Sequence, residues 1–304
     1  CIECGCCEPV CPSKGLTWSP RQRIVIWRDI QAKKRAGVDT RELEAAYEYQ
    51  GIDTCAATGL CAQRCPVGIN TGELVKKLRG QHATHKKTAN WLEGNFATAL
   101  QGARFTLHVA NGARMLLGAP RLAKLSATLT RLSKGQVPQW TNAMPQPEKA
   151  IRFSPTVSDE RPRVVYLAAC VSRAMGPAAG DKEQMSLYDK TRGLLEKAGY
   201  QVVFPDNLDN LCCGQPFASK GYAEQAEHKR QELLGALLHA SRGGLDPIYC
   251  DTSPCTLRLM QDLGDTRLDL YDPVRFIRSH LLERLDFTPQ DAPIAVHVTC
   301  STQH

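Results

Sequence analysis

The sequence predicts a mostly helical domain at the N-terminus, followed by an α/β domain whose sheet is mostly parallel. Three observations support this fold class. Cysteines crowd the first 65 residues around a helix-forming segment, and apolar residues then recur at helical intervals from Trp91 to Ser133. From Arg163 onward, strand-like runs alternate with helical segments. With 304 residues, the chain is also long enough for two domains.

The N-terminal domain is expected to span residues 1–80. Within it, the stretch RELEAAYEYQ (residues 41–50) predicts a helix that ends at Gly51, because glycine disfavours a helix interior. Two amphipathic helices should extend this domain over residues 81–134. Their apolar stripes are Leu92, Phe96, Ala99, Ala103 and Leu107, and then Leu122, Leu125, Leu129 and Leu132. We expect these stripes to pack on the protein itself, and a docking face for a partner or a peripheral membrane contact is the alternative.

A linker and the α/β domain should follow. The prolines scattered through residues 135–162 predict a linker there. Beyond it, five runs predict buried strands, which are RVVYLAAC (163–170), QVVF (201–204), PIYC (247–250), LDLY (268–271) and IAVHV (294–298). Helices should cover residues 182–198, residues 221–241 and a segment capped by Asp272. The α/β domain is therefore expected to span residues 163–304.

Composition and charge narrow the function classes. The formal charge of +7 is spread along the chain without an arginine-rich run, which indicates a solvated surface and no binding of nucleic acid. No apolar stretch is long enough to span a membrane and no signal peptide is visible, so the expected location is the cytoplasm, with the inner face of the membrane as an alternative. The fourteen cysteines are bunched beside Cys-Pro pairs, which favours metal ligation over disulfides.

The first cysteine motif has the spacing of bacterial ferredoxins, with two, two and three residues between its cysteines and a proline after the last. Its cysteines are Cys1, Cys4, Cys7 and Cys11. In this arrangement three thiolates surround one iron–sulfur cluster and the fourth reaches a neighbouring cluster. A structural zinc site is the alternative, although zinc ribbons do not require the Cys-Pro ending. Cys6 lies outside the register and is expected to be a packed thiol.

The second motif also ends in a Cys-Pro pair, but Thr58 stands where its second cysteine is expected. Its cysteines are Cys55, Cys61 and Cys65. By the crossover rule, the ligands of a 4Fe-4S cluster are Cys1, Cys4, Cys7 and Cys65. The ligands left for the second cluster are Cys11, Cys55 and Cys61. Three ligands suit a 3Fe-4S cluster, whereas a Thr58 hydroxyl, a water or Cys6 could complete a 4Fe-4S cluster instead.

Together the two motifs resemble the helical ferredoxin domain of the iron–sulfur subunits of succinate dehydrogenase and fumarate reductase. The resemblance covers the cysteine-rich part of residues 1–80. In that family the motif that lacks one cysteine carries a 3Fe-4S cluster. The resemblance therefore implies a 3Fe-4S cluster on the second ligand set.

A further group of cysteines follows the predicted strands of the α/β domain. Its members are Cys170, Cys212, Cys213, Cys250 and Cys255. Since ligands gather beyond the carboxyl ends of parallel strands, we expect these thiols to converge. The group resembles the cysteine-rich CCG domain of heterodisulfide reductase and of the iron–sulfur parts of glycolate and lactate oxidoreductases. Cys300, in HVTCSTQH, resembles the entrance to a second copy of that domain.

The CCG family separates its last two cysteines by two residues, whereas four residues separate Cys250 from Cys255. Two interpretations therefore stay open: thiol or cluster chemistry, or a structural remnant that helps to dock a flavin unit or an electron acceptor. The sequence shows no histidine metal motif, phosphate-binding glycine loop or nucleophile–base pair, so we assign no catalytic residue. Electron transfer is the reaction that this chain could perform.

A helical two-cluster ferredoxin domain joined to a CCG domain resembles the C-terminal half of FAD-linked D-lactate dehydrogenases (D-2-hydroxyacid dehydrogenases). The phrase YQGIDTCAATGLCAQRCPVGINTG (residues 49–72) carries this resemblance, and the glycolate oxidase iron–sulfur subunit is a near relative. The resemblance implies that FAD, held by a dehydrogenase domain before Cys1 or on a partner subunit, oxidises a D-2-hydroxy acid. It also implies that the electrons pass through the clusters to a cytochrome or quinone. We therefore expect the chain to be a fragment of a longer polypeptide.

Two rival functions remain. A thiol–disulfide oxidoreductase of the heterodisulfide reductase type would use Cys212 and Cys213 beside a reactive cluster, but it needs the complete family set of cysteines. A non-catalytic sensor or structural protein, held together by iron–sulfur clusters or zinc, is the rival from a different class.

Overall fold

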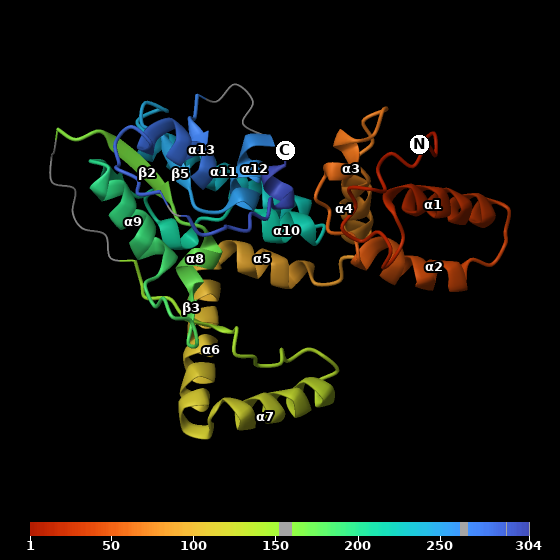
Figure 1. Ribbon diagram of the computed structural model, residues 1–304. Helices are drawn as coiled ribbons and strands as arrows, with labels where there is room; N and C mark the ends of the chain where they lie inside the picture. Colours follow the sequence, from red (N-terminus) through yellow and green to blue (C-terminus); the bar gives the residue numbers. More distant parts are fainter. Residues whose placement is uncertain (152–159, 262–266, 290, 304) are drawn as a thin grey trace. The chain divides into compact units, whose positions relative to one another are not determined.

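The computed structural model describes residues 1–151, 160–261, 267–289 and 291–303 (Figure 1). It divides into two compact units, each built from separate stretches of the chain. Unit 1 comprises Cys1–Asn90, Gly214–His228 and Ala292–His304, and unit 2 comprises Trp91–Cys213 and Lys229–Asp291. Among the described residues, no helix has both the length and the apolar character needed to cross a membrane.

Unit 1 is helical, and two of its helices begin at capping residues that the sequence supplies. Its helices and helical turns are α1 (Pro20–Arg35), α2 (Arg41–Tyr47), the π-helical turn η1 (Glu48–Asp53), α3 (Leu60–Gln63), α4 (Thr71–Gln81), α10 (Gln215–Ser219) and the 3₁₀ turn η4 (Cys300–Thr302). Ser19 and Gln22 form a capping box at the start of α1, and Asn70 caps α4 by accepting from Gly72 N. Two further helices, α5 (Lys86–Gly94) and α11 (Ala223–Ala240), each contain a chain boundary between the units.

The apolar core of unit 1 lies between α1, α2 and α4. Its buried members are Ile30, Tyr47, Ile52, Val75 and Leu78. The ring of Tyr47 is central, with its centroid 5.6 Å from that of Trp18 and 5.4 Å from that of Trp27. Its hydroxyl donates to Arg23 O at 3.0 Å, and burial raises the pKa of Tyr47 to about 12. The Tyr47 hydroxyl is therefore protonated at physiological pH and can donate this hydrogen bond.

The helix predicted over residues 41–50 does not end at Gly51. Regular α-helix stops at Tyr47, but the chain keeps winding as η1 as far as Asp53. A Cβ atom on Gly51 would lie 3.0 Å from ring atoms of Tyr47. The glycine is therefore required by close packing against an aromatic ring, and it does not act as the helix stop that we expected.

Residues 214–228 belong to unit 1 because they pack on α4. Arg79 of α4 donates to Ser219 O at 2.7 Å. The backbones of Gly80 and Gly221 approach so closely that a Cβ on Gly221 would lie 2.3 Å from Gly80 N. Gly221 also has φ +86°, which disfavours any other residue. A stretch inside the predicted α/β domain thus contributes to the helical unit.

Unit 2 contains a four-stranded parallel sheet with the order β4-β2-β5-β6. Figure 1 labels its two inner strands, β2 and β5. The strands are β2 (Arg163–Leu167), β4 (Gln201–Val203), β5 (Ile248–Cys250) and β6 (Leu270–Tyr271). Its helices and turns are α6 (Phe96–Leu117), α7 (Ala119–Leu132), α8 (Cys170–Ala174), α9 (Leu187–Lys197), the 3₁₀ turn η2 (Leu208–Asn210), α12 (Ser253–Gln261), α13 (Pro273–Phe276) and the π-helical turn η3 (Ile277–Leu281). Residues of β2 from Val164 onward are buried, as expected for an inner strand of a covered parallel sheet.

Aromatic rings dominate the core of unit 2 around Tyr166. The ring of Tyr166 stacks on that of Tyr188 with 5.8 Å between centroids, and it meets the edge of Tyr249 at 5.5 Å. Phe276, which is fully buried, packs edge-on against Tyr249 at 5.3 Å. Asp272 caps the short α13 by accepting from Val274 N and Arg275 N, as predicted. These rings fix the sheet against the helices that follow β2 and β6.

Three sequence expectations differ from the structure. Within the predicted linker, β1 (Pro145–Pro147) pairs antiparallel with β3 (Met175–Ala178), while residues 152–159 lie outside the described part of the chain. The predicted strand IAVHV, residues 294–298, is not a strand, and its apolar side chains are exposed because no neighbouring strand pairs with it. The stripe of α7 is only partly packed. Leu122 is buried, whereas exposed stripe residues are Leu125, Leu129 and Leu132.

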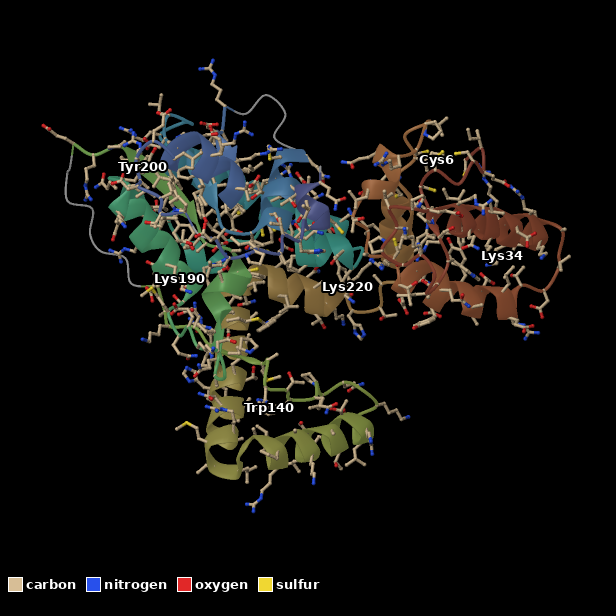
Figure 2. All side chains as sticks on the ribbon, viewed as in Figure 1. Cys6, Lys34, Trp140, Lys190, Tyr200 and Lys220 are labelled. Atoms are coloured by element: carbon tan, nitrogen blue, oxygen red, sulfur yellow. The ribbon has the colours of Figure 1, made fainter. Side chains whose placement is uncertain are left out.

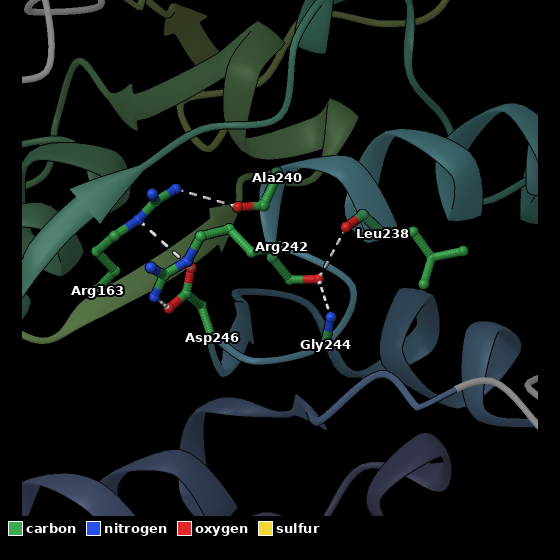
Figure 3. A network of polar contacts seen from close by, with 7 residues as sticks. Arg163, Leu238, Ala240, Arg242, Gly244 and Asp246 are labelled. Atoms are coloured by element: carbon green, nitrogen blue, oxygen red, sulfur yellow. Dashed lines mark hydrogen bonds and ion pairs between the residues drawn. The ribbon is translucent and has the colours of Figure 1, made fainter.

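A polar network fixes the end of α11 to the start of β2 (Figure 3). The buried carboxylate of Asp246 contacts Arg242 at 2.5 Å and Arg163 at 3.4 Å. Ser241 Oγ donates to Leu238 O at 3.4 Å and accepts from Gly244 N at 3.0 Å. These contacts satisfy polar groups at the helix end and direct the chain into β5.

Gly244 gives a direct test of this turn. It has φ +92°, and a Cβ there would lie 2.1 Å from Arg267 O, so Gly244→Ala should lower the free energy of unfolding by about 3 kcal/mol. The matched control is Gly235→Ala in α11, where nothing lies within 4 Å of the added Cβ. That substitution should raise stability by up to about 1 kcal/mol because alanine favours helix. Urea denaturation of both variants measures the difference, and equal effects would contradict this account of the turn.

Candidate metal centre

The cysteines of the two ferredoxin motifs lie on irregular segments of unit 1. Residues 1–11 precede α1 without regular secondary structure, Cys55 follows η1, Cys61 lies in α3, and Cys65 follows α3. The loop between Cys55 and α3 turns through a left-handed conformation at Ala57, with φ +49°, and again at Gly59. Such turns let a short chain present several side chains to one point.

The structure brings together the three cysteines predicted for the second cluster. Cys11, Cys55 and Cys61 line one pocket, together with Thr58 and Arg23. Cys11 is 8% exposed, and the other two thiols are half-buried. Thr58, which replaces the expected fourth cysteine, therefore lies in the same pocket as the three thiols.

Hydrogen bonds hold the first and second cysteine segments side by side. Ser13 Oγ donates to Thr54 O at 2.6 Å, and the hydroxyls of Thr17 and Thr54 lie 2.8 Å apart. Arg79 donates to Cys55 O at 2.8 Å and also to Ile52 O at 2.7 Å. The bonds of Thr54 with Ser13 and Thr17 join segments more than 35 residues apart, and they hold the chain near Cys11 beside the chain near Cys55.

The thiols predicted for the first cluster are more exposed. Cys4 and Cys6 are exposed, and Cys1, Cys7 and Cys65 are half-buried. Figure 2 shows Cys6 near other sulfur-bearing side chains. Hydrogen bonds from Cys6 lower the pKa of Cys4, whereas the side-chain hydrogen bond with Cys4 and the nearby charges of Cys4 and Cys65 raise the pKa of Cys6. Burial raises the pKa of Cys7, with a smaller contribution from Cys61.

The end of the second motif lies close to the first. The charge of Cys65 contributes to the raised pKa of Cys6, and the charge of Cys61 contributes to the raised pKa of Cys7. Within the described residues, no three His, Cys, Asp or Glu side chains lie close enough together to hold a single metal ion. The ligands of a multi-iron cluster bind different iron atoms and are spaced more widely than those of one ion.

Arg23 is the buried cation of the second pocket. It is 1% exposed, and its Nε donates to Gly51 O at 2.8 Å. Its terminal nitrogens donate to Gln50 O at 3.4 Å, to Thr54 Oγ1 at 3.3 Å and to Cys11 Sγ at 3.8 Å. All these acceptors are neutral unless the thiol is ionised, and the ion pairs of the described residues include none with Arg23.

A buried positive charge without a carboxylate is costly unless another anion balances it. Three thiolates around an iron–sulfur cluster form an anionic group at the place that Arg23 faces. The residues of the second pocket therefore fit an anionic cluster held by the three thiolates. Thr58 lies in the same pocket, where its hydroxyl could supply an oxygen ligand.

Sequence analysis did not identify Arg23 or Arg79, although one signal was available for Arg23. In α1, Arg23 occupies the same helical face as Ile26, Trp27 and Ile30, at intervals of three, four and seven residues. A charged side chain on an otherwise apolar stripe indicates a buried partner. Arg79 carries no comparable pattern, because its carbonyl acceptors come together only in the folded chain.

Unit 2 gathers the second group of cysteines at the carboxyl edge of its sheet. Cys170 begins α8 after β2, Cys250 ends β5, and Cys255 lies in the first turn of α12. Cys213 Sγ donates to Cys255 Sγ at 3.3 Å. A hydrogen bond with Cys212 and burial raise the pKa of Cys170, and burial raises the pKa of Cys250 to about 12.

The five predicted thiols of this group therefore converge, because parallel strands end at one edge. Cys300 is not among them. It lies in η4, within unit 1, and it is half-buried. Its segment does not form the opening strand of a second copy of the α/β domain.

Arg23→Gln tests the role of the buried cation. Losing the charge and the bonds to Gly51 and Gln50 should lower the free energy of unfolding by about 2–4 kcal/mol. It should also lower the reduction potential of the second cluster, since a nearby positive charge favours the more negative reduced state. The control is Arg35→Gln at the exposed end of α1. A potential equal to that of the control, measured by redox titration, would rule out this electrostatic role.

Comparison with known proteins agrees with this geometry. Residues 1–69 match the family model of the 4Fe-4S dicluster domain. Neither the curated proteins nor the solved structures that were searched include a match. The matched region holds all seven cysteines of the two ferredoxin motifs and Arg23. This match supports an iron–sulfur, ferredoxin-like domain in the N-terminal part of this chain.

Proposed function

We propose that this chain is the electron-transfer part of a flavin-dependent D-2-hydroxyacid dehydrogenase of the D-lactate dehydrogenase type. It would receive electrons singly from FAD on a dehydrogenase domain of the same polypeptide or of a partner subunit, and pass them to a cytochrome or quinone. The match of residues 1–69 to a dicluster domain supports the electron-transfer role. The flavin, the substrate and the acceptor rest on the resemblance of the combined cysteine motifs to that enzyme family.

The observation that carries the electron-transfer role is the pairing of two ligand sets within one small unit. We assign the 4Fe-4S cluster to Cys1, Cys4, Cys7 and Cys65. We assign the second cluster, a 3Fe-4S centre, to Cys11, Cys55 and Cys61. When bound, such clusters supply one-electron transfer at potentials set by charge, hydrogen bonds and exposure.

The chain's own residues then have distinct parts in this function. The thiolates would hold the two clusters on segments that the hydrogen bond from Ser13 to Thr54 ties together. Arg23 balances the negative charge of the second site from within the protein core. The exposed thiols of the first site, Cys4 above all, leave that site accessible to a redox partner.

Thr58→Cys tests the type of the second cluster. If the three thiolates hold a 3Fe-4S centre, the oxidised protein purified without oxygen should show its electron paramagnetic resonance signal. Supplying the fourth thiolate should abolish that signal and add about one iron atom per chain. Thr88→Cys adds an exposed thiol in the same unit outside the pocket and serves as the control. If the signal is absent before substitution, or if both variants behave alike, the 3Fe-4S assignment is wrong.

The relay itself is tested in a protein that also contains the flavin domain. D-lactate should reduce a quinone or cytochrome acceptor, and replacing Cys55 and Cys61 together by serine should slow this about tenfold or more. Reduction of the flavin by D-lactate should stay unchanged, because these residues touch no substrate. Cys300→Ser is the matched control, since it removes a thiol from the same unit outside the pocket. Turnover with glycolate but not D-lactate would favour the glycolate oxidase relative.

A further inference from the structure

The thiol pair Cys213 and Cys255 in unit 2 is independent of the ferredoxin motifs. Their Sγ atoms lie 3.3 Å apart, and a disulfide needs about 2.05 Å, so a movement of about 1.3 Å separates the dithiol from the bonded form. Cys213 is 4% exposed, and Cys255 is half-buried. We propose that these two cysteines form a reversible dithiol–disulfide couple that exchanges electron pairs with a thiol or disulfide partner.

The backbone on the Cys213 side is fixed by its neighbours. Arg173, which is 1% exposed, donates to Leu211 O at 2.6 Å just before the cysteine pair. Directly after Cys213, Gly214 has φ +80°, and a Cβ there would lie 2.2 Å from Ala226 O. Only glycine fits this position. The chain therefore holds the backbone at Cys213 in place.

The backbone on the Cys255 side is fixed by Asp251. Its carboxylate accepts from Ala169 N at 2.9 Å and from the Tyr166 hydroxyl at 3.0 Å, which ties the loop after β5 to the end of β2. Cys255 N then donates to Thr252 O at 3.1 Å as α12 begins. Two thiols on fixed backbones, already in contact, favour the formation of one particular disulfide.

Burial sets the order of the exchange steps. The more accessible Cys255, as its thiolate, attacks a disulfide RSSR and forms a mixed disulfide while one RS⁻ leaves. Cys213, as its thiolate, then attacks the sulfur of Cys255 and releases the second RS⁻. Overall, two thiols and RSSR give one protein disulfide and two RSH, so two electrons pass to the partner and the two protons are retained as RSH. The reverse reaction uses a dithiol as reductant.

Trapping in redox buffers tests this couple. The chain with its clusters bound is equilibrated in mixtures of reduced and oxidised dithiothreitol, quenched with acid, alkylated and cleaved without reductant. Mass spectrometry should find one peptide pair joined through Cys213 and Cys255, titrating as a single two-electron step. No cross-link at any buffer ratio, or one that joins Cys170 to Cys212, would overturn the proposal.

Single variants with oxidised glutathione test the order of attack. Cys213→Ser should accumulate a mixed disulfide on Cys255, whereas Cys255→Ser should form at least tenfold less on the buried Cys213. Cys250→Ser is the control, because the fully buried Cys250 donates to Thr252 O, and that variant should keep the cross-link. Equal labelling of the two single variants would contradict the assigned order.

Iron content separates the couple from the alternative of a cluster on these thiols. Cys255→Ser should retain as much iron and sulfide per chain as the wild type, and circular dichroism should show that it is folded. If it is not, Cys255→Ala replaces it, and the wild-type trapping result stands independently. A loss of iron in a folded variant would assign these thiols to a cluster and refute the couple.

Discussion

The buried guanidinium of Arg23 is the constraint on which the helical unit depends. A cation in the protein core needs hydrogen-bond acceptors and a balancing negative charge. Without them, the free-energy cost of desolvating the cation would exceed the stabilisation gained from packing. Arg23 takes its acceptors from the backbone of Gly51 and Gln50, so the winding of η1 past Gly51 is part of the same arrangement. The remaining face of the guanidinium points to Cys11. Arg23 therefore contributes both to the packing of α1 on η1 and to the charge of the pocket.

The cysteines come together through different kinds of structure in the two units. Unit 1 uses irregular segments, in which left-handed turns at Ala57 and Gly59 and side-chain bonds such as Ser13 to Thr54 bring distant cysteines together. Unit 2 uses a regular sheet, whose parallel strands end at one edge and carry cysteines there. The first arrangement leaves Cys4 and Cys6 exposed, whereas the second buries three of its five thiols and half-buries the other two. Burial of the second group raises thiol pKa values, as at Cys250, and therefore favours the protonated form.

Features that depend on neighbouring residues could be predicted from the sequence. The ferredoxin spacing is confirmed as a dicluster motif, the parallel order of the strands is present, and the Asp272 cap is observed. The predictions were wrong where the conformation depends on residues that pack nearby in the folded chain. The run IAVHV has strand propensity but no strand beside it, and Gly51 lies under the ring of Tyr47 instead of ending a helix. The ligand sets, the type of the second cluster and the domain limits remain predictions.

The sequence by itself determined that this chain carries an iron–sulfur domain. Several ligands of one cluster must lie close together, and the short intervals between the cysteines can be read directly from the sequence. Tertiary structure alone decided what surrounds those ligands. Arg23 and Arg79 find their acceptors on segments far from them in sequence, and Cys213 meets Cys255 only when two loops come together at one edge of a sheet. Burial and electrostatic balance depend on distance in space, which spacing along a chain does not specify.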